Sequence, residues 1–271
     1  MRFSICNELF ENWSWERTCE FVGRIGYDGI EVAPFTLAES VTDVSPERRA
    51  AIRRQAEQAG LTVVGLHWLL VSPKGLYINH PDADIRARTA QYLAALVDFC
   101  GDLGGRVMVL GSPKQRSVVE GLTREQAWRF AKDTLRPALD RAAARGVFIC
   151  PEALTPTETD FLNTASEARR FVEDLAHPSA RMMLDVKAMS SEGRPIPDII
   201  RDNGDLLVHL HANDANMRGP GFGDTDFGPI AAALRDVGFD GFVSVEVFDF
   251  KPDPETIAAR SLAYLKRKFG G

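Results

Sequence analysis

The chain has 271 residues, of which 45% are hydrophobic and 26% are charged, a composition typical of a folded globular protein with a sizeable core. Its 32 Lys and Arg against 38 Asp and Glu give a net charge of -6, which argues against nucleic acid as a partner. The longest apolar runs stop well short of the roughly 20 residues that a membrane span requires. The N-terminal segment meets Glu8 and Glu11 before any run long enough for a signal peptide. We therefore expect a cytoplasmic protein with neither a nucleic-acid nor a membrane partner.

Short apolar segments alternate with longer amphipathic segments along the whole chain. Helix signals support several boundaries: Pro46 opens one helical segment and Gly60 follows it, and Thr123 with Gln126 forms a capping-box pattern. In chain order, the pattern predicts strands at 2–6, 29–32, 61–67, 106–110, 147–152, 181–185, 206–211 and 241–246, and helices at 15–25, 46–59, 82–103, 123–144, 164–175, 196–202, 227–237 and 254–268.

Eight strand-then-helix units in a chain of this length match the rhythm of one (β/α)8 barrel, whereas a doubly wound sheet more often has five or six strands. No GxGxxG lies between a strand and a helix, and no GxxxxGK[ST] occurs, so nucleotide-binding motifs give no support to another α/β fold. We predict an α/β protein with a single (β/α)8 TIM barrel, residues 1–271 forming one domain.

Four successive predicted strands end in ionisable side chains, and active sites of such barrels lie at the carboxyl ends of the strands. These residues are Glu152, Asp185, His211 and Glu246. The period-two rule points all four inward, where they converge on one small volume. Three buried anionic groups need a compensating cation, and carboxylate with imidazole suits Mn, Mg, Co or Zn. We therefore predict one divalent metal ion held by these four residues.

Each residue taken singly has a plainer explanation. A glutamate at a strand end is often a helix-cap or salt-bridge partner, and His211 alone would more often be a hydrogen-bonded structural histidine. His209, two residues earlier on the same face, is expected one layer deeper in the barrel. The repetition over four strands is what favours a shared site.

The run of four residues resembles the xylose-isomerase-like barrel superfamily and, within it, the ketose 3-epimerase group that includes the tagatose and allulose epimerases. The resemblance covers nearly the whole chain. The motifs that carry it are GYDGIEV at 26–32, ETDFLNT at 158–164, HANDAN at 211–216 and GPGFGDTDF at 219–227.

The resemblance implies that the four residues hold one Mn, Mg or Co ion, and that Glu152 and Glu246 also move the proton at the carbon next to the substrate carbonyl. This is chemically consistent, because a metal bound by the carbonyl and adjacent hydroxyl stabilises an enediolate between two carboxylates. Glu158 matches a residue that contacts the sugar. His67, at the end of the third strand, is a candidate for a sugar hydroxyl or, equally, a capped strand-end histidine.

The chain departs from the group at two positions that normally hold the carbonyl end of the substrate. A histidine three residues after the strand-six aspartate is replaced by Ala188, and an arginine six residues after the strand-seven histidine is replaced by Met217. Lys187 and Arg218 each stand one position away. They are candidates for substrate binding through replacement positive charge, or else solvated loop residues.

The function that we predict is a metal-dependent sugar isomerase or epimerase that abstracts a proton next to a carbonyl through a metal-stabilised enediolate. The alternative is a metal-dependent lyase or dehydratase acting on a keto sugar or keto-inositol, since the same proton removal with a leaving group on the next carbon gives elimination. A DNA-repair enzyme of the endonuclease IV type needs more histidines than the five present. A non-catalytic sugar-binding role is the fourth hypothesis. The predicted partner is a small carbohydrate, and similar barrels are often homodimers or tetramers.

Overall fold

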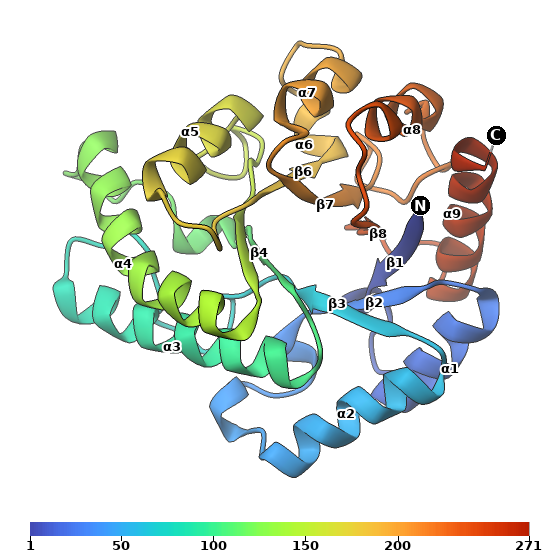
Figure 1. The fold of residues 1–271 in the computed structure, drawn as a ribbon, viewed down its shortest axis with the longest axis horizontal. Helices are drawn as coiled ribbons and strands as arrows, with labels where there is room; N and C mark the ends of the chain where they lie inside the picture. Colours follow the sequence, from blue (N-terminus) through green and yellow to red (C-terminus); the bar gives the residue numbers. More distant parts are fainter. Residues whose placement is uncertain (271) are drawn as a thin grey trace.

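The computed structural model describes residues 1–270 and consists of parallel strands at the centre of a ring of helices (Figure 1). The strands pair in the order β5-β4-β3-β2-β1-β8-β7-β6. A parallel bridge between Ile149 and Ala180 links the two edge strands, so the sheet is a nearly closed barrel. The strands are β1 (Arg2–Cys6), β2 (Gly29–Val32), β3 (Thr62–Leu66), β4 (Val107–Leu110), β5 (Phe148–Pro151), β6 (Met182–Asp185), β7 (Leu207–Ala212) and β8 (Phe242–Val245).

The helices lie outside the barrel, and the long helices α3 and α4 run side by side (Figure 1). Among residues 1–270, every helix is too short or too polar to span a membrane. The helices are α1 (Trp15–Ile25), α2 (Pro46–Gln58), α3 (Ala83–Asp102), α4 (Arg124–Arg145), α5 (Ala165–Leu175), α6 (Val186–Ser190), α7 (Ile196–Asn203), α8 (Phe227–Asp236) and α9 (Pro254–Phe269), with short 3-10 turns η1 (Asn7–Leu9), η2 (Pro34–Thr36), η3 (Val41–Asp43) and η4 (Pro113–Gln115).

Local capping interactions fix the helix ends. The Thr123 side chain accepts a hydrogen bond from the Gln126 amide while the Gln126 side chain accepts one from the Thr123 amide, so the predicted capping box is present. Gly26 ends α1 with φ +97°, a left-handed conformation that favours glycine. These caps explain why most predicted boundaries lie within two residues of the observed ones.

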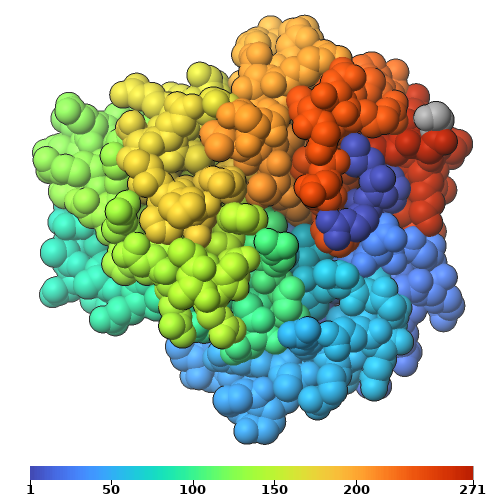
Figure 2. All heavy atoms as spheres, viewed as in Figure 1, coloured from blue at the N-terminus to red at the C-terminus, as the bar shows by residue number. Residues whose placement is uncertain are grey.

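The two ends of the chain meet and help to close the barrel. β1 pairs with both β2 and β8, and the Phe3 ring packs edge-to-face on Phe269 of α9 at 5.5 Å. In the space-filling view, the first residues in dark blue lie against the orange and red segments of β8 and α9 (Figure 2). The strand register at this junction determines which side chains face the barrel interior.

The predicted (β/α)8 barrel is confirmed, with differences in detail. The predicted strand 147–152 ends at Pro151 and the predicted strand 241–246 ends at Val245, so Glu152 and Glu246 each lie one residue beyond their strand. Helix α6 was not predicted. It begins directly after Asp185 because the Asp185 side chain caps it, accepting a hydrogen bond from the Ala188 amide.

The close approach of β3 to β4 requires glycine at position 65. A Cβ on Gly65 would overlap the carbonyl oxygen of Val107, which is backbone and cannot rotate away. We expect Gly65→Ala to lower the free energy of unfolding by about 1–3 kcal/mol, as overpacking of a core does, measured by urea denaturation. Gly228→Ala is the control, because its Cβ would meet only the Asp226 carboxylate at 3.3 Å. Equal stability of the two variants would contradict the prediction.

Candidate active site

The four predicted ligands come together at the carboxyl ends of the barrel strands. Asp185 ends β6 and pairs in register with His211 of β7, while Glu152 and Glu246 follow β5 and β8 directly. One ligand atom from each residue lies within 4.8 Å of the others, and all four residues are buried. The barrel therefore places three carboxylates and an imidazole around one point.

The His211 ring directs Nδ1 toward two of these carboxylates. Nδ1 lies 3.1 Å from Glu246 Oε2 and 3.4 Å from Glu152 Oε1, yet within residues 1–270 it has no partner in hydrogen-bonding geometry. An unpartnered buried polar atom carries a free-energy cost, and here it faces the point that the carboxylates share. This arrangement fits a divalent cation bound by Nδ1 and carboxylate oxygens.

Asp185 shows the electrostatic consequence of this crowding. Burial, together with the charges of Glu152 and Glu246, raises the pKa of Asp185 to about 7. Its two oxygens accept hydrogen bonds from the Ala188 amide and the Asn213 side chain, which hold the carboxylate in place. A divalent cation would offset the repulsion among the three carboxylates.

Glu31 of β2 is a buried carboxylate that holds the opposite side of the His211 ring. Glu31 Oε1 lies 3.1 Å from His211 Nε2, and Glu31 Oε2 lies 2.9 Å from His209 Nε2. Burial alone would raise the pKa of Glu31, but the charges and hydrogen bonds of these two histidines lower it well below its ordinary value. Since Glu31 engages Nε2, the His211 ring presents Nδ1 to the carboxylates. His209 is fully buried and pairs with Met183, as His211 pairs with Asp185 two residues later, so it lies one layer deeper in the barrel, as predicted.

His67 lies between two glutamates. Its Nε2 is 2.7 Å from Glu8 Oε2, and its Nδ1 is 3.8 Å from Glu31 Oε1. Burial alone would lower the pKa of His67, but the charge of Glu8 and its hydrogen bond raise it to about 9. The structure therefore brings His67 to the wall of the site, with its outer nitrogen already engaged by Glu8.

Lys187 and Glu158 form an ion pair at the edge of the cluster. Lys187 Nζ donates to Glu158 Oε1 at 2.7 Å and lies 4.1 Å from the centre of the Phe248 ring. Burial alone would lower the pKa of Lys187, but the charge of Asp185 and the contact with Glu158 raise it. The structure thus places a cation near the position where the chain has Ala188 instead of histidine.

Arg218 is the predicted site residue that the structure does not bring to the cluster. Its guanidinium donates to the Lys251 carbonyl at 3.0 Å and lies over the Phe222 ring. The preceding residue, Met217, has φ +68° and is exposed, and its carbonyl accepts the Phe248 and Asp249 amides. The loop after β7 thereby directs Arg218 along the β8 loop, away from the four ligands.

Sequence reasoning did not assign roles to four residues that support the site, of which three are buried and Glu8 is partly exposed. In the sequence, Glu8, Glu31 and Asn213 lie within longer segments, and no pattern assigns any of them a role of its own. Arg116 is fully buried, and its Nη1 donates to the carbonyls of Leu110 and Glu152. These hydrogen bonds hold the backbone in place at Glu152. No motif marked Arg116, because its partners are backbone atoms.

The fold and site together define a (β/α)8 barrel with an acidic, histidine-containing site at the carboxyl ends of strands β5 to β8. Residues 19–268 match the family described as "Xylose isomerase-like TIM barrel". The chain belongs to this family.

Curated relatives are sugar epimerases by name. D-psicose 3-epimerase of Agrobacterium fabrum is 27% identical over 248 residues, covering 88% of this chain and 83% of the relative. 3-Dehydro-D-guloside 4-epimerase of Escherichia coli is 24% identical over 275 residues, covering 98% of this chain and 99% of the relative. These relatives confirm the predicted enzyme of the isomerase or epimerase type and give no support to the lyase alternative.

Solved structures show the same fold. A D-psicose 3-epimerase crystallised in the presence of D-fructose superposes with a TM-score of 0.88 at 24% identity, covering 100% of both chains. The apo form of the Escherichia coli 3-keto-D-glucoside 4-epimerase superposes with a TM-score of 0.86 at 20% identity, covering 98% of this chain and 99% of that chain. The barrel architecture is therefore shared over the whole length of each chain.

Proposed function

We propose that this protein epimerises a keto sugar at the carbon next to its carbonyl, with Glu152 and Glu246 as the two proton-transfer groups. The observation that carries the proposal is the position of these glutamates beside the same His211 nitrogen, at 3.4 and 3.1 Å. They come from β5 and β8, strands that are not neighbours in the barrel. Two carboxylates reaching one point from different strands can address opposite faces of a substrate carbon.

The reaction needs one carboxylate to accept the proton and the other to supply a proton to the opposite face. Glu152 and Glu246 alternate between these two roles according to the direction of reaction, and no net oxidation or reduction occurs. Arg116 holds the backbone at Glu152, and Asn213 with the Ala188 amide holds Asp185.

The ligand set that we propose for one divalent ion is Glu152, Asp185, His211 and Glu246, with Mn, Mg or Co as first choices and Zn as a further one. When bound, the ion would polarise the substrate carbonyl and stabilise the negative charge of the enediolate. Lys187, paired with Glu158, adds a positive charge at the edge of the proposed metal site. These two residues are our candidates for binding substrate hydroxyl groups, with His67 at the opposite wall.

The proposed substrate class is a keto sugar. The relatives are named for two kinds of substrate, the free ketose D-psicose and a 3-dehydro glycoside, and both contain a carbon-bound proton acidified by a neighbouring carbonyl. A cytoplasmic location and a dimeric or tetrameric assembly stay predictions from the sequence.

Solvent-deuterium exchange tests the proposal. The protein would be incubated in D2O with added Mn or Mg and a panel of free ketoses and 3-keto sugars, and NMR would follow deuterium entry next to the carbonyl. We expect deuterium incorporation together with an epimeric product. Loss of water or of an aglycone would instead indicate elimination, and a metal-loaded protein that exchanges no proton in any member of the panel would contradict the proposal.

Removal of the metal should lower thermal stability. A ligand that binds only the folded state, at about 100 times its Kd, stabilises by about 2.7 kcal/mol, which corresponds to a Tm higher by about 5–10 °C in a chain of this size. We therefore expect excess EDTA to lower the Tm of the Mn-loaded protein by this amount. His211→Ala is the matched control, since its Tm should not respond to EDTA. An unchanged Tm in the parent protein would contradict the proposed metal site.

A further inference from the structure

A large cavity opens beside the candidate active site, at the same end of the barrel. Trp68 and Phe248 line both this cavity and the small space that contains His67, Glu152 and Glu246, so the two spaces share a wall. The cavity has a volume of about 630 Å³. Its other walls come from the segments that follow β1, β2, β3 and β8, which are the carboxyl ends of those strands.

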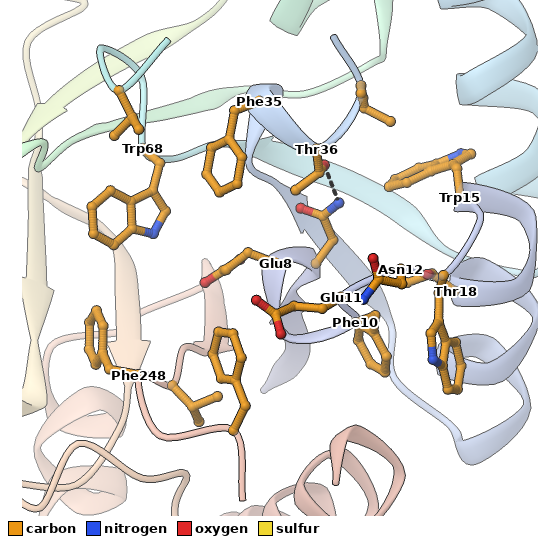
Figure 3. Close-up of a pocket in the computed structure, with 16 residues that line it drawn as sticks. Glu8, Phe10, Glu11, Asn12, Trp15, Thr18, Phe35, Thr36, Trp68 and Phe248 are labelled. Atoms are coloured by element: carbon orange, nitrogen blue, oxygen red, sulfur yellow. Dashed lines mark hydrogen bonds between the residues drawn. The ribbon is translucent and has the colours of Figure 1, made fainter. Parts of the chain in front are cut away.

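The cavity combines aromatic faces with carboxylates. Phe35 and Trp68 border the space into which Glu8 and Glu11 project, with Phe248 on the far side (Figure 3). The remaining aromatic lining is Phe10, Trp13, Trp15 and Phe250. Among the described residues that line it there is no lysine or arginine.

This chemistry matches a neutral, hydroxyl-rich ring. Aromatic side chains pack against the apolar C–H faces of a sugar, and carboxylates accept hydrogen bonds from its hydroxyl groups. The carboxylate of Glu11 repels a phosphate, and the described lining residues include no lysine or arginine to bind one. A cavity of this volume falls in the range of about 300–1,000 Å³ that holds whole drug-sized ligands, which exceeds the needs of a single six-carbon sugar.

We propose that this cavity binds the second, uncharged sugar ring of a keto-glycoside, so that the substrate class is an unphosphorylated glycoside rather than a free ketose. This inference rests on the proposed function: the space beside Glu152 and Glu246, at about 20 Å³, admits only the reacting edge of the keto ring, so the cavity must hold the rest of that ring together with the second ring. The wall shared by Trp68 and Phe248 joins the two positions.

Tryptophan fluorescence provides a test that does not need turnover. Three of the four tryptophans in the chain, Trp13, Trp15 and Trp68, line the cavity. The Mg-loaded protein would be titrated with cellobiose, glucose and glucose 6-phosphate. We expect cellobiose to bind about tenfold more tightly than glucose, the gain that one to two aromatic stacking contacts supply, and glucose 6-phosphate to bind no better than glucose.

Phe35→Ala isolates the cavity, since Phe35 is 41% exposed and its truncation leaves the core intact. This variant should lose most of the cellobiose preference, so that its affinities for cellobiose and glucose become nearly equal. Phe130→Ala is the matched control, because Phe130 is a partly exposed residue of α4 that stacks with Arg86 outside the cavity. Three results would each overturn the inference: equal affinities of the parent protein for cellobiose and glucose, an unchanged cellobiose preference in Phe35→Ala, or binding of glucose 6-phosphate that is tighter than that of glucose.

The two proposals fail separately. Deuterium exchange on free ketoses without a cellobiose preference would reject the glycoside substrate and retain the epimerase. A Phe35-dependent cellobiose preference without deuterium exchange on any keto sugar would reject the epimerase and retain the sugar-binding cavity.

Discussion

Glu152→Gln is expected to lower the rate of epimerisation by about 10²- to 10⁴-fold, the contribution of a positioned general acid or base. Glutamine has nearly the same shape but cannot accept a proton. Because the Glu152 carbonyl and not its carboxylate is the acceptor for Arg116, the substitution leaves that buried contact in place. The measurement is epimer formation by NMR with the substrate identified by deuterium exchange.

Glu246→Gln is the paired variant that makes the test specific. Epimerisation needs both carboxylates, but exchange needs only the one that removes and returns a proton on the same face. With the starting sugar as substrate, one variant should therefore introduce deuterium into that sugar without forming its epimer. The other variant should introduce deuterium only when the epimer is supplied as the substrate. Near-native epimerisation by either variant would show that the two-glutamate mechanism is wrong. Glu57→Gln, on the exposed surface of α2, is the control and should leave the rate unchanged.

The four proposed ligands could be found from the sequence because each one is marked by a local pattern. A short apolar strand that ends in an ionisable residue shows which face that residue occupies, and the barrel topology then brings successive strand ends to one place. The structure moves the ends of β5 and β8 by one residue and keeps the convergence. Periodicity and topology are sufficient for this part of the site.

The remaining contacts depend on closure of the barrel, which no local pattern encodes. Glu31 contacts His209 and His211, 178 and 180 residues later in the chain, because β1 lies between β2 and β8. Glu8 reaches His67 through the 3-10 turn after β1. Arg218 shows the opposite case: its charge suggested substrate binding, but the left-handed backbone at Met217 sets the loop path that carries it away.

Glu31→Gln is expected to weaken Mn²⁺ binding by about 10- to 100-fold, although Glu31 is not among the proposed ligands. Loss of a carboxylate that orients a metal-binding histidine typically has this effect. The carboxylate accepts from both His209 Nε2 and His211 Nε2, whereas a glutamine amide has one oxygen and must direct its NH2 group at the other ring. His211 then loses the contact that presents Nδ1 to Glu152 and Glu246.

Calorimetric titration with Mn²⁺ distinguishes this positioning role from a merely structural one. The parent protein, Glu31→Gln and His211→Ala would be compared, with circular dichroism to establish that each is folded. We expect affinity to fall in that order, since His211→Ala removes a proposed ligand atom and Glu31→Gln only misdirects it. An affinity of folded Glu31→Gln within twofold of the parent would show that the position of Nδ1 does not depend on Glu31, and that packing of His211 against the His67 and His209 rings, at 6.1 and 5.2 Å, is sufficient to hold it.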